Sequence, residues 1–138
     1  MAILVAYDGS EPAQEAVEHA VRNYPGEEIV LLRVVEAAGG STGAGMNLAR
    51  EFLKERRTEI SESIDEDVAE IAADDDVEFR TETAVGDPAR AIVSFAEDHD
   101  IDHIVVGNHG RSGVSRVLLG SVAEGIVRRA PAPVTVVR

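Results

Sequence analysis

The stretch VVGNHGRSGVSRVLLGS, residues 105–121, decides how the rest of the sequence is interpreted. It contains Gly107, Gly110 and Gly120, follows an apolar run at 104–106, and precedes a helix-like apolar pattern at 122, 126 and 127. A buried strand, a glycine-rich turn and a helix start can form an anion site, because bare backbone N–H groups approach a phosphate closely and the helix end adds positive potential. A plain turn and helix cap explain the same residues, since Ser121 and Glu124 fit the capping box S-x-x-E. The two interpretations are compatible.

Local charge favours the anion site. Residues 107–130 contain four arginines and one acid, Glu124, although the whole chain has a formal net charge of −13. Arg128 and Arg129 suit the C-terminal end of the following helix. Arg111 and Arg116 instead lie beside the glycines. A positive island in so acidic a molecule indicates an anionic ligand.

Length and composition set the class of protein. A chain of 138 residues with 44% apolar content predicts one domain, residues 1–138, with its own core. The absence of cysteine excludes disulfides and thiolate metal sites. The sequence shows no basic leader and no apolar run near the roughly 20 residues of a membrane span, so we expect a soluble, cytoplasmic protein without membrane association.

The balance of charged residues is unusual. There are 26 acids against 13 basic residues, of which only Lys54 is a lysine. An acidic surface argues against nucleic acid and anionic membranes as partners. Acid excess with arginine in place of lysine predicts a halophilic protein, because concentrated salt screens self-repulsion.

Hydrophobic periodicity predicts strands alternating with helices. We expect strands at 2–7, 28–35, 77–83, 103–106 and 134–137, and helices from about Pro12 to residue 23, from about 47 to 72, from Pro88, and from the residue after Ser121 to Arg129. Ser10 and Asp87 are predicted N-caps. The strand at 77–83 alternates in polarity, which predicts an edge strand. The low-complexity segment 37–45 is expected to be a mobile surface loop, a linker rather than a lid.

This alternation predicts an α/β fold, a single-domain open five-stranded parallel sheet with helices on both faces. In the strand order 3-2-1-4-5, ligands bind where the order reverses, between the carboxyl ends of the first and fourth strands. Asp8 follows the first strand and Gly107 ends the fourth. The sequence therefore places a carboxylate and a glycine loop at one crevice.

The pattern Gly107-x2-Gly110-x9-Gly120-Ser121 resembles the nucleotide motif of the universal stress protein (UspA-like) family, in its ATP-binding branch. The similarity extends over nearly the whole chain: AYDGS at 6–10, GDP at 86–88, GSVAE at 120–124 and PVTVV at 133–137 match the family as well. The resemblance implies a Rossmann-like fold of the adenine nucleotide alpha-hydrolase type. Members without these glycines are not expected to bind ATP, and this chain has all three.

The resemblance also implies roles for individual residues. Ala6, Tyr7 and Asp8 would line the nucleoside pocket, with Asp8 near the ribose or a water-bound metal, and Val34 or Val35 would offer backbone to adenine. Val106, Gly107 and Gly110 would lie close to ribose and phosphate, with the basic Arg111 in the same loop. Gly120, Ser121 and Val122 would hold the outer phosphates. ATP would bring Mg²⁺ or Mn²⁺, since oxygen-rich sites suit hard cations.

The last strand, Val134, Thr135, Val136 and Val137, commonly pairs with its copy in a second subunit in this family. An apolar edge strand is a liability unless covered, so a homodimer through this strand is expected on physical grounds too. The resemblance implies a nucleotide-dependent stress-response or signalling module.

A slow, metal-dependent ATP hydrolase is the alternative function. Against it, no general base is evident: His109 lies in the glycine loop, and His19, His99 and His103 show no metal or triad pattern. A phosphoacceptor receiver needs paired acids after the first strand and a late lysine, which this chain lacks. The glycine spacing is neither the dinucleotide fingerprint nor the P-loop motif.

Overall fold

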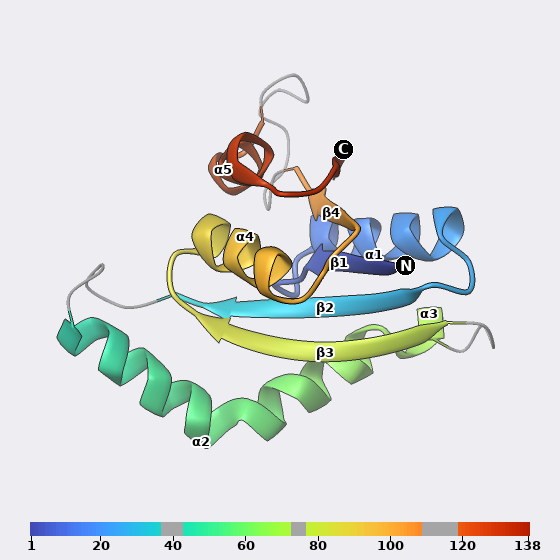
Figure 1. The fold of residues 1–138 in the computed structure, drawn as a ribbon. Coiled ribbons are helices and arrows are strands. Elements are labelled where there is room, and N and C mark those ends of the chain that lie inside the picture. Colours follow the sequence, from blue (N-terminus) through green and yellow to red (C-terminus); the bar gives the residue numbers. More distant parts are fainter. Residues whose placement is uncertain (37–42, 73–76, 109–118) are drawn as a thin grey trace.

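Five parallel strands form one sheet in the order β3-β2-β1-β4-β5 (Figure 1). The structure, a computed structural model, describes residues 1–36, 43–72, 77–108 and 119–138. The strands are β1 (Ala2–Ala6), β2 (Glu28–Val35), β3 (Glu78–Val85), β4 (His103–Gly107) and β5 (Val134–Val137). The helices are α1 (Glu11–Asn23), α2 (Gly43–Asp67), α3 (Ala69–Ala72), α4 (Pro88–Asp98) and α5 (Ser121–Arg129). The predicted fold class and strand order are confirmed.

The alternation of side chains along the strands builds an apolar layer on each face of the sheet. Ile3 and Val5 pack with α1 and with Ile64 and Val68 near the C-terminal end of α2. Leu4, between them in sequence, points to the other face. There it joins a cluster of β2, β4, α4 and α5 residues, namely Val30, Leu32, Ile92, Ala96, Ile104 and Ile126. Figure 1 shows α2 and α4 on opposite sides of β2 and β3.

The strand β1 lies between β2 and β4. Its register pairs Ile3 with Ile29 on one side and with His103 on the other. The Ala2 N–H also donates to an Asp102 carboxylate oxygen at 2.8 Å. The central strand therefore joins the start of the chain to a segment about a hundred residues further on, and the carboxyl ends of β1 and β4 become neighbours.

Two predicted helix starts are confirmed. The Ser10 hydroxyl accepts the Ala13 N–H at 3.3 Å, and an Asp87 carboxylate oxygen accepts the Arg90 N–H at 3.2 Å. A proline in the first turn follows each cap, where its missing N–H costs no hydrogen bond.

The predicted capping box of α5 is wrong. Gly120 is the N-cap, with φ −65° and ψ 157°, and Ser121 is already the first helical residue. The Gly120 carbonyl accepts the Glu124 N–H at 2.9 Å. The Glu124 carboxylate pairs instead with Arg128 at 2.7 Å, one turn further along the helix. Glycine is an acceptable N-cap, so the helix begins one residue earlier than the serine signal indicated.

The long helix also differs from the prediction. It begins at Gly43 rather than 47, so residues 43–45 of the predicted loop are helical, and 37–42 lie outside the described residues. Glycines are tolerated in a first turn, which has few intrahelical hydrogen bonds to lose. A break at Val68 divides α2 from α3, but the Val68 N–H still donates to the Ile64 carbonyl at 3.1 Å. Within the described ranges, no helix has the length and apolar content of a membrane span.

Candidate functional site

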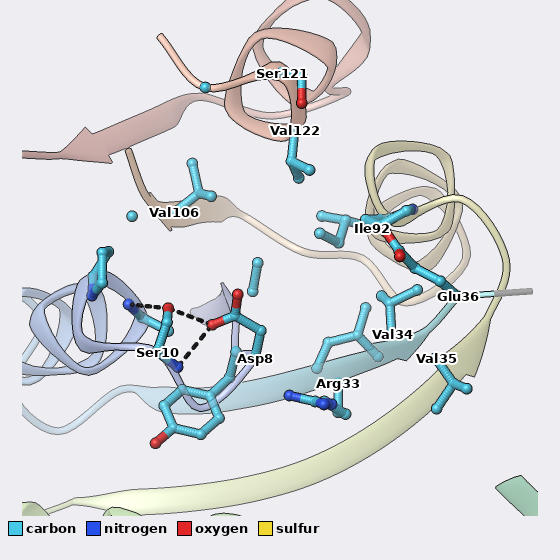
Figure 2. A pocket seen from close by; sticks show the side chains of 18 of the residues that line it. Asp8, Ser10, Arg33, Val34, Val35, Glu36, Ile92, Val106, Ser121 and Val122 are labelled. Atoms are coloured by element: carbon cyan, nitrogen blue, oxygen red, sulfur yellow. Dashed lines mark hydrogen bonds between the residues drawn. The ribbon is translucent and has the colours of Figure 1, made fainter. Parts of the chain in front are cut away.

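A cleft of about 710 Å³ opens at the carboxyl ends of β1, β2 and β4. Every described residue of the predicted site lines it: Ala6, Tyr7, Asp8, Val34, Val35, Val106, Gly107, Gly120, Ser121 and Val122. Gly110, Arg111, Arg116 and His109 lie outside the described residues. Figure 2 shows the side chains of Ser121 and Val122 on one side of this space, Asp8 on another, and Val34 and Ile92 on a third.

The turn after β1 holds the Asp8 side chain in place. Asp8 Oδ1 accepts the Ser10 N–H at 2.9 Å and also the Ser10 hydroxyl. Gly9, between them, has φ +83°, a conformation that suits glycine. The second carboxylate oxygen of Asp8 points toward the middle of the cleft (Figure 2). One oxygen of Asp8 therefore stabilises the turn, and the other faces the cleft.

Tyr7 lines the cleft, but its hydroxyl group is directed elsewhere. The side chain is 2% exposed, and its hydroxyl donates to an Asp67 carboxylate oxygen of α2 at 3.3 Å. Burial raises the pKa of the phenol above its usual value, with a smaller contribution from the Asp67 charge. The Tyr7 N–H is bonded to the Leu32 carbonyl at 3.0 Å. The Tyr7 side chain thus links the floor of the cleft to α2, and its hydroxyl and N–H are both engaged within the protein.

Gly107 is required by packing against α1. A Cβ built at this position would lie 2.6 Å from the Pro12 carbonyl oxygen and 2.9 Å from the Pro12 Cβ. Contacts this short do not occur for real side chains, and the backbone atoms of Pro12 have little freedom to move. The first turn of α1 can therefore approach β4 only because residue 107 lacks a side chain.

The N-terminal turn of α5 closes one end of the cleft. The first N–H groups of a helix have no intrahelical partner, and they lie at the positive end of its dipole. At the N-cap, Asn108 takes one such group, because its Oδ1 accepts the Gly120 N–H at 2.9 Å. Ser121 is exposed and Val122 is half-buried at the edge of the cleft. This end suits an anion.

The opposite wall is mainly apolar. Val34 at the end of β2 lies across from Ile92 of α4, with the Glu36 side chain near them (Figure 2). Pro88 at the start of α4 also lines this wall. A slot of this kind suits a flat, partly apolar group.

Several lining residues were missed in the sequence: Ser10, Pro12, Ala13, Leu32, Arg33, Glu36, Phe52, Ile60, Pro88, Ile92 and Asn108. Most are close in sequence to predicted site residues, whereas Phe52, Ile60, Pro88 and Ile92 come from α2 and α4, which reach the cleft only in three dimensions. The predicted position of Asp87-Pro88 at the start of a helix, on the same edge of the sheet, was the one available signal for Pro88 and Ile92. A smaller cleft of about 360 Å³ continues between the β1 turn and α2, and Arg33, Phe52 and Ile60 line both spaces.

Metal-binding clusters are absent from the part of the chain that the structure describes: no three His, Cys, Asp or Glu residues come close enough to hold an ion. Of the four histidines, His103 is placed away from the cleft, with Nε2 2.7 Å from the Thr135 hydroxyl of β5. Burial lowers its pKa, with a smaller contribution from His19.

Comparison with known proteins identifies similar chains. A model of the universal stress protein family matches residues 1–138. Universal stress protein MJ0531 of Methanocaldococcus jannaschii is 37% identical over 142 residues, which cover 99% of this chain and 81% of that protein.

Solved structures agree with the sequence matches. The structure of universal stress protein UspA from Lactobacillus plantarum superimposes with a TM-score of 0.78 at 29% identity, covering 100% of this chain and 97% of that one. A universal stress protein solved in complex with cAMP matches with a TM-score of 0.62 at 26% identity, covering 100% and 97%.

Proposed function

The chain belongs to the universal stress protein family, and from this premise we propose that it is an ATP-binding member, a nucleotide-dependent stress-response or signalling module. The observation that carries the proposal is the cleft itself. It lies where the strand order reverses, with a helix N-terminus at one end and an apolar slot opposite. An adenosine polyphosphate has the matching distribution of anionic and apolar parts.

The proposed pose follows from these two ends. The base lies in the slot between Val34 and Ile92, and the phosphates reach the first turn of α5 at Ser121 and Val122. The free oxygen of Asp8 faces the ribose in between. The family member solved with cAMP supports an adenine nucleotide as the ligand class, at 26% identity to this chain. Gly110 and Arg111 of the glycine loop, which lie outside the described residues, complete the proposed set of residues close to ribose and phosphate.

We propose that Mg²⁺ or Mn²⁺ enters with the triphosphate as its counter-ion. Carboxylate and phosphate oxygens are the donors that these hard cations prefer. Asp8 is the described residue suited to reach the ion, through water, because one of its oxygens faces the cleft (Figure 2). The ion would supply charge neutralisation for the phosphates.

We further propose that the protein acts as a homodimer through β5. This strand is at one edge of the sheet and pairs with β4 alone among the described strands. Its four residues are all half-buried. Antiparallel pairing with a second copy would satisfy the free edge and cover its valines.

Calorimetric titration with MgATP tests the binding function, and Gly120→Val tests the location of the site. The Gly120 backbone is extended, a conformation open to any residue, so backbone strain does not explain this glycine. We expect Gly120→Val to fold, by circular dichroism and thermal unfolding, and to lose at least about tenfold in ATP affinity through obstruction of the phosphates. Ser94→Val, at an exposed position of α4 away from the cleft, is the control. If Gly120→Val binds ATP as well as the parent does, the site is elsewhere.

Phosphate release under multiple turnover separates this module from the alternative hydrolase. A binding module needs no turnover, and any hydrolysis should remain close to the uncatalysed background. A rate well above background, lost in Asp8→Asn but retained in Ser94→Val, would establish the enzymatic role instead.

A further inference from the structure

Asn108 occupies a junction between three elements. It follows the last residue of β4, and its Oδ1 accepts the N–H of Gly120, the N-cap of α5, at 2.9 Å. Its own N–H donates to the Val137 carbonyl of β5, also at 2.9 Å. The side-chain bond spans twelve positions of sequence. It therefore joins the residue that follows β4 to the residue that precedes α5, which are the two ends of the glycine loop.

This contact replaces a missing half of the α5 cap. In a capping box, the side chain at the third helical position reaches back to the N–H of the N-cap residue. Here the third helical residue is Ala123, which has no side-chain oxygen. Asn108, from another element, supplies the acceptor instead. Without it, the half-buried Gly120 N–H would lose this partner, and the start of α5 would lose a hydrogen bond to the residue that follows β4.

The contact also determines which donors remain for a ligand. Since the Gly120 N–H is committed to Asn108, the next donors of the first turn are the N–H groups of Ser121 and Val122 and the Ser121 hydroxyl. Their direction depends on the orientation of that turn. The turn is attached to the sheet through the Asn108 amide, and Asn108 is itself held by the β4–β5 ladder, where Gly107 pairs with Val137.

We propose that Asn108 is a positioning residue of the phosphate subsite. It binds the N-cap of α5 in place of a ligand and aims the following two N–H groups at the terminal phosphates. This inference rests on the proposed nucleotide function. It departs from the simplest use of the glycine motif, in which the Gly120 N–H itself would bind phosphate.

Asn108→Ala and Asn108→Asp test the proposal, with Asn23→Ala as the matched control. The Asn23 side chain likewise bonds to backbone: its Nδ2 donates to the His19 carbonyl at 2.8 Å, at the C-terminal end of α1. The measurement is calorimetric affinity for adenosine and for MgATP, because the ratio of the two isolates the phosphate contribution. We expect Asn108→Ala to bind adenosine like the parent. Its phosphate gain, the ratio of the affinity for MgATP to the affinity for adenosine, should fall about tenfold, which corresponds to one hydrogen bond. Asn23→Ala should retain the full gain.

Asn108→Asp keeps the acceptor and adds a negative charge. At low salt it should bind ATP weakly. In about 1 M salt, where charges are screened beyond about 3 Å, its phosphate gain should equal that of the parent at the same salt concentration. Asn108→Ala should not recover. In amide hydrogen exchange by NMR, the Gly120 N–H should be protected in the parent and in Asn108→Asp but exchange faster in Asn108→Ala.

The outcomes are distinguishable. If the parent binds neither adenosine nor ATP, the proposed function fails and the positioning role fails with it. If the parent binds ATP and Asn108→Ala keeps the full phosphate gain, only the positioning role is overturned. Equal losses for adenosine and ATP in both variants would assign Asn108 a purely structural role and would also overturn it.

Discussion

Two separate reasons favour a glycine at position 107: the approach of a ligand, which the family motif implies, and the packing of α1 against β4. The motif predicts a bare backbone next to a ligand; in the structure Gly107 lines the cleft, and its missing side chain also makes room for Pro12. We expect Gly107→Ala to destabilise the protein by about 1–3 kcal/mol, the usual range for overpacking, with or without nucleotide. Urea unfolding measures this effect. Ser94→Ala, at an exposed helical position, should stay within about 0.5 kcal/mol of the parent. An unchanged midpoint for Gly107→Ala would show that α1 shifts at little cost.

His103 adds a pH-dependent contribution to stability. Its ring contacts Tyr24, the C-cap residue of α1, and interacts electrostatically with His19 of α1, and its Nε2 lies next to the Thr135 hydroxyl of β5. Burial lowers the folded-state pKa below 6.5, so the unfolded chain takes up the proton first as the pH falls. This contribution is complete above pH 6.5 and is lost as the pH falls through the folded pKa.

Other groups of the chain also change the stability as the pH falls, so the contribution of His103 is measured as a difference between the parent and a variant. The free energy of unfolding of His103→Gln, subtracted from that of the parent, should be constant above about pH 7.5 and should shrink toward acid pH. His99→Gln is the control, since His99 is an exposed residue at the C-cap of α4. A difference curve that is flat from pH 5 to 8 would contradict the assignment.

At the scale of residues, the sequence located the cleft but not its full lining. Asp8, Gly107 and Ser121 could be placed together because each ends or begins an element at the same edge of the sheet. Asn108 could not, because its role depends on a contact with Gly120 that no periodicity reports. Ser121 was misassigned as a cap for a related reason: the pattern S-x-x-E describes a local hydrogen-bonded unit, and a non-local side chain supplies the equivalent bond.

At the scale of elements, α4 and α5 are in close contact at Ala89 and Gly125. A Cβ on Gly125 would lie 2.8 Å from the Cβ of Ala89, which is rigid and buried. Alanine at a mid-helix glycine normally stabilises a helix by about 1 kcal/mol. We expect the opposite sign for Gly125→Ala, a loss of about 1–3 kcal/mol, because the two helices would have to separate.

The double variant Ala89→Gly with Gly125→Ala exchanges the two side chains across this contact. It should be more stable than the sum of the single changes indicates, with a coupling energy above about 0.5 kcal/mol in chemical denaturation. Additive effects would mean that the helices do not touch at this point in solution.

Elements with strong local signals were predicted to the residue. The strands β2 and β5 have the expected bounds, and α5 ends at the expected residue, because turn residues and prolines stand at these ends. The start of α2 was missed by several residues, since Gly43 and Gly45 argue locally for a loop. The break at Val68 was missed too, because the apolar spacing of Ile64, Val68 and Ile71 continues through it.

At the scale of the whole molecule, charge dominates. The chain has a net charge of −13 and a pI near 4.6, and its described ion pairs are few and exposed, such as Arg80 with Glu28 at 3.6 Å. Exposed pairs contribute little, so they do not offset the repulsion among the acids. We expect the urea midpoint at pH 7 to rise as KCl increases from about 0.05 M to about 2 M, by screening.

The control uses the pI. At a pH near 4.6 the net charge is close to zero, so the same KCl series should leave the midpoint nearly unchanged. A urea midpoint at pH 7 that does not change with KCl concentration would contradict the adaptation to concentrated salt that the composition predicts.

The position of β1 in the sheet has a consequence for synthesis. Its partner β2 follows within the first 35 residues, but its other partner, β4, begins only at His103. A chain still emerging from the ribosome can pair the first two strands early. It must then carry the bare edge of β1 and the uncovered side of Leu4 until most of the protein has been made. We therefore expect no stable native-like intermediate on the ribosome, but a late, cooperative closure that leaves the nascent chain dependent on chaperones until then.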